Sequence, residues 1–194
     1  GVEVAEGYAY VIGDYGGLFV ISVDDPAALE IVATLSIDGY GVAIDVDGDL
    51  AFIAANGLHI VSIADPRMPV ELGALTSDQL AVSVFAADDV VFLGDGSILR
   101  IISVSDPSHP IELGMNALGL GPRVSVVGEY AITALEWRGV RILSIADPTY
   151  IHEVTGIGTA DRAVGTALSG DYIYVADQDG GLFILRLVLE DDAG

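Results

Sequence analysis

The sequence predicts an all-β fold: a five-bladed β-propeller of four-stranded antiparallel blades, with three strands in the last blade. The first observation is a repeat, because Asp-Pro recurs with its prolines 40, 41 and 41 residues apart. The second is that an apolar run rich in β-branched residues precedes each Asp-Pro, whereas no segment of useful length has helical periodicity. Short strands repeated at this period are typical of a propeller. The pairs are Asp25-Pro26, Asp65-Pro66, Asp106-Pro107 and Asp147-Pro148.

The second unit illustrates the expected order of strands within a blade. Strands are predicted over residues 42–46, 50–54, 58–63 and 70–75. Asn56-Gly57 predicts a hairpin turn of the type that needs positive φ. Because the strands are almost continuously apolar, the sheets are expected to be buried on both faces. The pattern predicts a single domain over residues 1–189, with blades at about 1–37, 38–77, 78–119, 120–160 and 161–189, followed by an acidic tail over residues 190–194.

Two segments of the repeat resemble a known family. Residues 57–66 and 139–148 each hold a Gly, an apolar strand and then Ser-Ile-Ala-Asp-Pro, and Pro-Val-Glu-Leu-Gly follows over residues 69–73. This pattern is similar to the LVIVD repeat, over nearly the whole chain. The resemblance implies a β-propeller that is secreted or exposed at the cell surface. One departure is that Ser stands where the family often has Asp in this strand, at Ser22, Ser62, Ser103 and Ser144.

The composition excludes several classes of function. The 29 acidic residues and seven arginines give a net charge of −22, and Lys is absent, so nucleic acid and anionic membrane surfaces are poor partners. The absence of Cys excludes disulfides, thiol catalysis and zinc fingers. The longest run without Asp, Glu or Arg, residues 50–64, is too short to span a membrane. The acidic balance is typical of proteins that work in high salt. No cofactor is expected, although weak surface binding of Ca²⁺ or salt ions is an alternative.

The loops at one face of the predicted propeller hold the first candidate site. Trp137 is the only Trp and lies at a hairpin tip, and three arginines map to the same face. An exposed aromatic beside Arg favours an anchor for a protein partner or a sugar ring. The alternative is that Trp137 folds onto its own blade and the arginines pair with Glu136 and Asp161. The candidate binding residues are Trp137, Arg138, Arg123, Arg162, Tyr15, Tyr40 and Glu136.

The last blade holds the second candidate site. It has sequence for three strands and few residues for a fourth, so its outer strand is expected to have an open edge, unless the blade is simply three-stranded or the protein continues. Open edges invite addition of a strand from another chain, including self-association. The candidate interface residues are Gly181, Leu182, Phe183, Ile184, Leu185, Arg186, Leu187 and Val188.

Catalysis is a weaker reading of the sequence. Glu3 and Asp45 lie at equivalent places in the innermost strands of adjacent units, where two acids could form an acid–base pair of a glycan hydrolase. The alternative is that these acids are structural hydrogen-bond acceptors among apolar residues. Residues 45–49 resemble part of a calcium loop but fit an ordinary turn better. The expected function is a non-catalytic extracellular or cell-surface module for protein–protein interaction, with self-assembly as one form of it. The alternatives are a small-ligand or glycan-binding propeller and, less favoured, the hydrolase.

Overall fold

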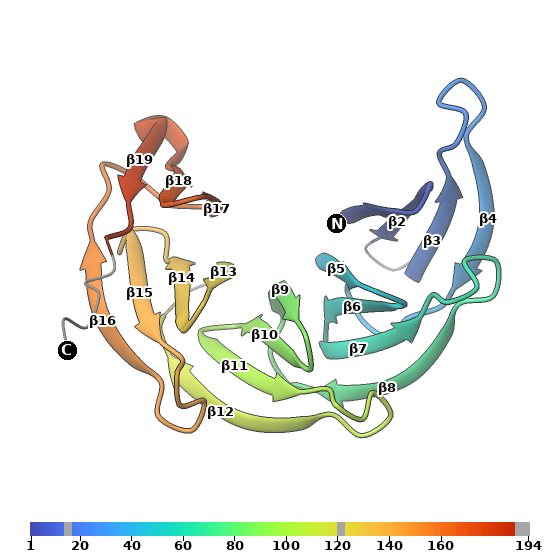
Figure 1. Ribbon diagram of the computed structural model, residues 1–194, viewed down its shortest axis with the longest axis horizontal. Coiled ribbons are helices and arrows are strands. Elements are labelled where there is room, and N and C mark those ends of the chain that lie inside the picture. Colours follow the sequence, from blue (N-terminus) through green and yellow to red (C-terminus); the bar gives the residue numbers. More distant parts are fainter. Residues whose placement is uncertain (14–16, 120–122, 189–194) are drawn as a thin grey trace. The chain divides into compact units, whose positions relative to one another are not determined.

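The computed structural model describes residues 1–13, 17–119 and 123–188, which form an all-β chain (Figure 1). The chain divides into two compact units, residues 1–122 and residues 123–194. The first unit contains three four-stranded sheets, and the second contains one four-stranded and one three-stranded sheet among its described residues. The prediction of a single domain stays a prediction, and the acidic tail lies outside the described residues.

Each sheet is an antiparallel meander in which strands pair in chain order. We number these sheets blades 1 to 5 in chain order. The strands are β1 (Val2–Ala5), β2 (Tyr8–Gly13), β3 (Gly17–Ser22), β4 (Glu30–Leu35), β5 (Ala43–Asp47), β6 (Leu50–Ala55), β7 (Gly57–Ser62), β8 (Val70–Thr76), β9 (Ala81–Ala87), β10 (Val90–Asp95), β11 (Ile98–Ser103), β12 (Ile111–Ala117), β13 (Arg123–Val127), β14 (Tyr130–Ala134), β15 (Val140–Ser144), β16 (His152–Ile157), β17 (Gly165–Ser169), β18 (Tyr172–Ala176) and β19 (Leu182–Arg186), with a 3-10 turn η1 (Gln178–Gly180) before β19.

The turns follow from residue types at fixed places in the repeat. The four strands predicted for the second repeat, residues 38–77, are confirmed within one residue at each end, as β5 to β8. In the β6–β7 hairpin the positive φ falls on Gly57 (+110°) and not on Asn56, a difference from the expected turn type. An ideal Cβ on Gly57 would lie 2.1 Å from the carbonyl oxygen of Leu75, so the next strand passes where a side chain would stand. The predicted turn at residues 45–49 is an ordinary β5–β6 connection.

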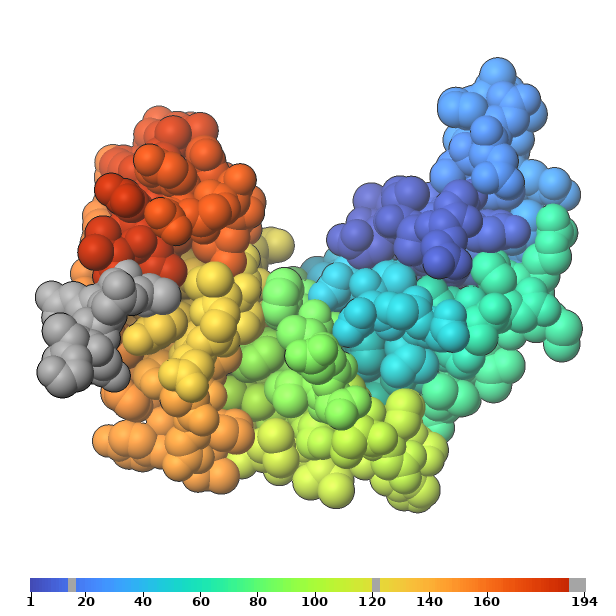
Figure 2. All heavy atoms as spheres, viewed as in Figure 1, coloured from blue at the N-terminus to red at the C-terminus, as the bar shows by residue number. Residues whose placement is uncertain are grey.

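The Asp-Pro pairs form the same closed turn four times. In blade 2 the Asp65 carbonyl accepts the N–H of Met68 at 2.8 Å, and its Oδ1 accepts the N–H of Arg67 at 3.0 Å. Proline supplies the φ that the second turn position needs, and the Asp side chain caps the turn. Asp25, Asp106 and Asp147 make the same pair of bonds. The β3–β4 connection of blade 1 projects beyond its strands (Figures 1 and 2).

A break in register follows each Asp-Pro turn. In four blades the register between the third and fourth strands shifts by one residue at an equivalent place. The shift follows a residue of the third strand, which is Val20, Ile60, Ile101 or Ile142. An extra residue at a β-bulge increases the local twist of the sheet. The recurrence of the bulge shows that the repeat specifies the curvature of its outer strand as well as its length.

The cores lie between consecutive blades. We call the face that a blade turns to the next blade its forward face, and the opposite one its rear face. The forward face of blade 1, with Tyr10 and Leu18, packs on the rear face of blade 2, with Ile44 and Ile53. Equivalent clusters join blade 2 to blade 3 and blade 4 to blade 5. The prediction of strands buried on both faces is therefore confirmed for the middle strands of blade 2, β6 and β7, and is wrong for its outer strand β8, which is mostly exposed. Among the described residues, no helix has the length and apolar character of a membrane span.

Candidate binding site

The candidate site of the second unit is assembled by two loops. The β14–β15 turn holds Glu136 and Trp137, and the β16–β17 loop holds Arg162 and Ala163. Glu136 and Ala163 form an isolated antiparallel bridge, with backbone N–H···O bonds of 3.0 and 3.1 Å in the two directions. Glu136 has a positive φ of +47°, which turns the chain sharply before Trp137. The bridge therefore places Arg162 beside the hairpin tip of the preceding blade.

Arg162 contacts both neighbours at this tip. Its Nη2 lies 2.7 Å from Oε1 of Glu136, and its guanidinium carbon lies 5.7 Å from the centre of the Trp137 ring. The Trp137 side chain is nevertheless 70% exposed. A guanidinium over an indole gains cation–π attraction, and the ion pair with Glu136 holds it in place. Trp137 does not fold onto its own blade, so the structure leaves an open aromatic surface beside a charged pair.

The structure brings together only some of the predicted site residues. Arg123, the first residue of β13, is exposed. Arg138 is exposed, and its carbonyl accepts a bond from Arg141. Tyr40 lies in the β4–β5 loop of the other unit. Tyr15 lies outside the described residues. Glu136, Trp137 and Arg162 are thus the set with shown mutual contacts.

The predicted edge strand is β19. It pairs with β18 on one side, and within residues 1–13, 17–119 and 123–188 no strand pairs with its other side. Leu187 donates its N–H to the Asp171 carbonyl at 2.7 Å, so the odd-numbered residues of this segment bond to β18. The N–H and C=O groups of Leu182, Ile184 and Arg186 therefore point to the open side. By contrast, β3, β7, β11 and β15 are paired on both sides.

A basic residue on the third strand pairs with a glutamate twelve residues later, a pattern that the sequence analysis missed. His59 Nδ1 lies 2.7 Å from Glu71, Arg100 Nε bonds to Glu112, and Arg141 Nε lies 3.3 Å from Glu153. In blade 1 the equivalent residues are the apolar Phe19 and Ile31. The sequence signal for this pairing is that the two positions change together from blade to blade, either to a basic residue with Glu or to Phe19 with Ile31. In blade 5 the third-strand residue is Phe183, as in blade 1.

Arg100 in blade 3 has a second carboxylate partner. Its Nη1 bonds to Oδ2 of the buried Asp95 at 3.0 Å, while Oδ1 of Asp95 has no partner among the described residues. Burial alone would lower the pKa of Arg100, but the hydrogen bonds and charges of Glu112 and Asp95 raise it above its ordinary value. These residues line an open hollow of about 420 Å³ together with Gln79. Sequence reasoning did not single out this cluster.

Asp45 has a structural role in the seam between blades. Its Oδ2 accepts the N–H of Ala86 in the next blade at 2.7 Å, and its Oδ1 accepts the N–H of Val46 at 3.0 Å. Burial raises the pKa of Asp45 despite these bonds. Burial, and then the charge of Asp45, raise the pKa of Glu3. Both carboxylate oxygens of Asp45 thus accept backbone hydrogen bonds, in agreement with the alternative that Asp45 is a structural hydrogen-bond acceptor.

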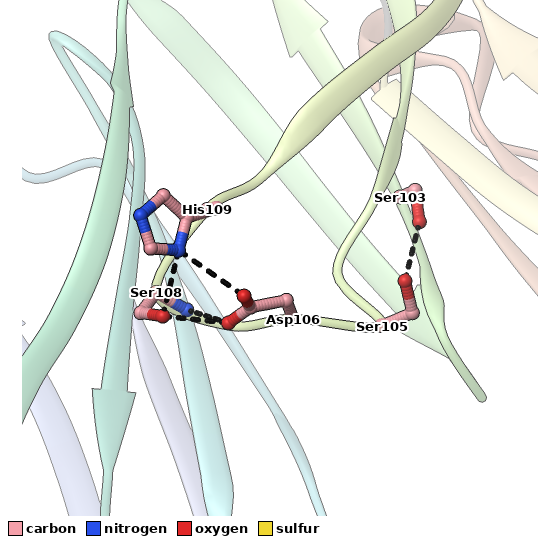
Figure 3. A network of polar contacts seen from close by, with 5 residues as sticks. All are labelled: Ser103, Ser105, Asp106, Ser108 and His109. Atoms are coloured by element: carbon pink, nitrogen blue, oxygen red, sulfur yellow. Dashed lines mark hydrogen bonds and ion pairs between the residues drawn. The ribbon is translucent and has the colours of Figure 1, made fainter.

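A Ser, His and Asp cluster in the third Asp-Pro turn does not have the geometry of a catalytic triad (Figure 3). Ser108 Oγ lies 3.0 Å and Asp106 Oδ2 lies 3.1 Å from the same nitrogen, Nδ1 of His109. A triad needs the hydroxyl and the carboxylate on opposite ring nitrogens. Ser108 instead donates to Asp106 at 2.6 Å, and these bonds lower the pKa of Asp106. No cluster of three or more metal-binding side chains occurs in the described ranges.

Solved structures share the fold at low sequence identity. The computationally designed Ika8 protein matches 96% of the chain with a TM-score of 0.76 and 8% identity, and the chain spans 57% of its length. A protein from Lactobacillus plantarum matches 94% of the chain with a TM-score of 0.76 and 18% identity. A functionally unknown protein from Desulfotomaculum acetoxidans matches 95% with a TM-score of 0.78 and 15% identity. The chain spans 68% of each of these two proteins. No curated protein matches the sequence.

The repeats themselves have a family profile. The profile described as the LVIVD repeat matches residues 1–35, 38–76, 81–116, 119–159 and 162–185. Each match covers the strands of one blade, including the three strands of blade 5. The fold is that of β-propeller blades, as the sequence predicted, and because the matches together span most of its length, the chain belongs to the LVIVD repeat family.

Proposed function

We propose that the chain is a non-catalytic extracellular or cell-surface module that mediates protein–protein interaction. The observation that supports this function best is the one-sided pairing of β19 within the described residues. A strand with unpaired N–H and C=O groups is a template for strand addition, in which main-chain bonds supply affinity and alternate side chains supply specificity. The acidic, Lys-free composition suits a protein in a salt-rich medium and supports the proposed location.

The neighbours of β19 suggest what an added strand would look like. Every other third strand in the described chain pairs with a fourth strand of its own blade. Where that third strand holds a basic residue, the fourth strand presents Glu, whereas Phe19 of blade 1 corresponds to Ile31. Because β19 has Phe183 at this place, we expect it to favour a strand with an apolar residue there over one with a glutamate, which would gain no basic partner.

Two synthetic peptides test this function. A fluorescein-labelled peptide with the sequence of residues 29–36, which contains β4, should bind the protein and increase its fluorescence anisotropy. A peptide with the sequence of residues 69–76 places Glu71 beside Phe183 without the basic partner that Glu71 has in His59. It should bind about two- to fivefold more weakly, because a partly exposed ion pair is worth up to about 1 kcal/mol. Equal binding of the two peptides would contradict the proposed preference of β19 for a strand with an apolar residue at this position.

Two variants of one residue separate main-chain pairing from side-chain packing. Ile184→Pro removes an N–H that points to the open side without removing a bond to β18, and proline is tolerated on strand edges of this kind. It should abolish binding of the first peptide. Ile184→Ala keeps the N–H and should retain binding. If neither peptide binds, or if Ile184→Pro binds as the unchanged protein does, strand addition at β19 is wrong.

A second candidate function is binding of a small ligand or glycan at Trp137. It is favoured by the open indole surface, whose ring also contacts Arg162. The C–H face of a sugar ring, or a flat apolar ligand, packs well on such a surface. Since Trp137 is the only Trp, its fluorescence reports on this site alone. Titration with neutral and uronic-acid oligosaccharides should change this fluorescence, and an unchanged spectrum at millimolar sugar would remove the candidate.

A further inference from the structure

The hollow beside Arg100 lies at the seam between blades 2 and 3. Arg100 pairs with Leu93, which belongs to the core cluster between these blades, so both side chains are on the rear face of blade 3. The β8–β9 loop forms the other wall, and every lining residue belongs to the first compact unit. The volume of about 420 Å³ falls within the range of sites for small organic molecules.

At the equivalent place in the seam between blades 1 and 2, two apolar side chains fill the space. Ile37 and Ala55 are buried there and belong to the core cluster of that seam. Their counterparts at the hollow are Ser77 and Asp95. The N atoms of Ile37 and Ser77 each lie 2.9 Å from the ideal Cβ of the glycine that begins a third strand, and Ala55 and Asp95 each end a second strand. Polar groups thus replace the apolar filling at the hollow.

The seam between blades 4 and 5 shows the same replacement. Thr159 stands at the place of Ile37, and Asp177 stands at the place of Asp95. Asp177 is fully buried, and its Oδ2 accepts the N–H of Asp161 at 2.8 Å. Its Oδ1, like that of Asp95, has no partner among the described residues. A small polar loop residue therefore occurs twice together with a buried carboxylate, of which the protein engages one oxygen.

Asp95 is held in the wall of the hollow with one acceptor to spare. Its side chain is 3% exposed, and its Oδ2 accepts from Arg100 at 3.0 Å. The β9–β10 register shifts between Gly94 and Asp95, an irregularity of the kind that re-aims a side chain. The exposed Gln79 side chain lies over Gly96, whose ideal Cβ would be 2.8 Å from Gln79 Oε1. Rotation of Gln79 therefore opens this corner, and a ligand that donates to the unpaired Oδ1 removes the cost of burying it unpaired.

The charges around the hollow favour a cationic ligand. Asp78, Asp95 and Glu112 line it together with a single basic residue, Arg100. The net charge of −22 on the whole chain also attracts cations. Because Arg100 already takes Oδ2 of Asp95, one oxygen remains. A single oxygen suits the point charge of an ammonium group better than the two-pronged guanidinium, which binds best to both oxygens of a carboxylate.

We propose that this hollow binds a primary ammonium group carried on an aliphatic stem, with Asp95 as the acceptor at its base. Ile98 and Met115 supply the apolar wall along which the stem lies. The chain contains no Lys, so the ammonium group belongs to another molecule, either a free amine or the Lys side chain of a partner protein. The site is separate from β19, and its test does not depend on strand addition there.

Two probes that differ only in the ammonium group test the site on the unchanged protein. Nα-acetyl-lysine methylamide, titrated at fixed ionic strength, should shift the NMR signals of the Gly96 N–H, the Gln79 side-chain amide and the Arg100 Nε–H, with saturation. Nα-acetyl-norleucine methylamide has a similar stem without the charge and should leave them unchanged. 1,5-Diaminopentane identifies the source: tighter binding of this diamine indicates a free amine, and tighter binding of the lysine probe indicates a protein side chain.

Variants locate the binding. Asp95→Asn should weaken binding of the lysine probe about tenfold or more, because a buried hydrogen bond to a charged group is lost. Glu71→Gln removes the same charge from the third-to-fourth-strand pair of blade 2 and should bind as the unchanged protein does, which controls for general attraction. Ser77→Ile introduces the side chain that fills the preceding seam and should also weaken binding. It replaces Asp95→Asn if circular dichroism shows that the latter does not fold.

Three outcomes would overturn the inference. Absence of any shift at millimolar lysine probe would mean that Asp95 Oδ1 bonds to water only. Equal shifts with the norleucine probe would mean that the hollow recognises the stem alone. Equal shifts with Ca²⁺ at the same concentration and ionic strength would mean that it attracts any cation. Peptide binding at β19 decides the proposed function separately in each case.

Discussion

Replacing Gly57 by Ala tests why a glycine begins the third strand of the repeat. Its φ is +110°, and an ideal Cβ there would lie 2.1 Å from the Leu75 carbonyl oxygen of β8. Gly48, in the β5–β6 turn, provides a matched control. Its φ is +54°, and no atom lies within 4 Å of its ideal Cβ. The two substitutions add the same methyl group at positive φ and differ mainly in the space available.

The structure gives the expected magnitudes. Gly48→Ala should cost about 1 kcal/mol, the strain of placing a side chain in the left-handed region. Gly57→Ala has comparable or larger strain of about 1–3 kcal/mol. In addition, β8 must move by about 1 Å before the contact becomes tolerable, which loosens β7–β8 bonds worth about 1 kcal/mol each. We expect a total of about 3–4 kcal/mol, a large part of the 5–15 kcal/mol typical of whole domains.

Urea unfolding followed by far-ultraviolet circular dichroism measures the difference. Both variants should keep the slope of the transition, and Gly57→Ala should have the lower midpoint by a margin that corresponds to about 2–3 kcal/mol. Equal midpoints for the two variants would refute the reasoning. It would mean that β8 yields freely and that the glycine is required only for its φ.

Three further predictions concern charge. Arg100→Met should destabilise the protein by about 3 kcal/mol, because it leaves the Asp95 carboxylate buried and uncompensated. Arg141→Met should cost less than about 1 kcal/mol in the same urea assay, because its partner Glu153 is more exposed. Equal losses of stability in the two variants would contradict this. The Thr149 hydroxyl and N–H lower the pKa of Asp147, so this group adds stability above its unfolded pKa that is lost as pH falls through the folded pKa. Thr149→Val should raise that pKa toward its ordinary value in a carboxyl NMR titration, and an unchanged titration would show that the hydroxyl has no effect. Finally, the melting temperature should rise between low salt and about 2 M NaCl as self-repulsion is screened; stabilisation by millimolar Ca²⁺ at fixed ionic strength would instead indicate surface calcium binding.

The fold could be predicted because its determinants are local and repeated. Asp65-Pro66 closes a turn whose bonds span two or three residues, so its sequence is sufficient to place the end of one strand and the start of the next. Gly57 marks the hairpin for the same reason. The position of Arg162 over the Trp137 ring could not be predicted, because it depends on a bridge between Glu136 and Ala163 in different loops. The sequence predicted that both loops lie on the same face of the propeller, but not that they contact each other.

Buried charge was missed for a different reason. No motif in the sequence singles out Arg100, and its partner Glu112 belongs to another strand. The distance of twelve residues becomes meaningful only once the bulge and register of the two strands are known. Asp45 likewise accepts a bond from Ala86, a backbone group that any sequence would supply. Its role depends on how blades stack rather than on the identity of its partner.

The meander topology has a consequence for how the protein is made. Every strand pair joins neighbours in sequence, and each Asp-Pro turn closes within its own blade. During synthesis at about 5–20 residues per second, a segment of one blade takes about 2–8 s to emerge, whereas a β-hairpin forms in about 1–10 μs. Each blade can therefore complete its hydrogen bonds before the next one has been synthesised. The sheets can therefore form one after another, in the order in which their strands are synthesised.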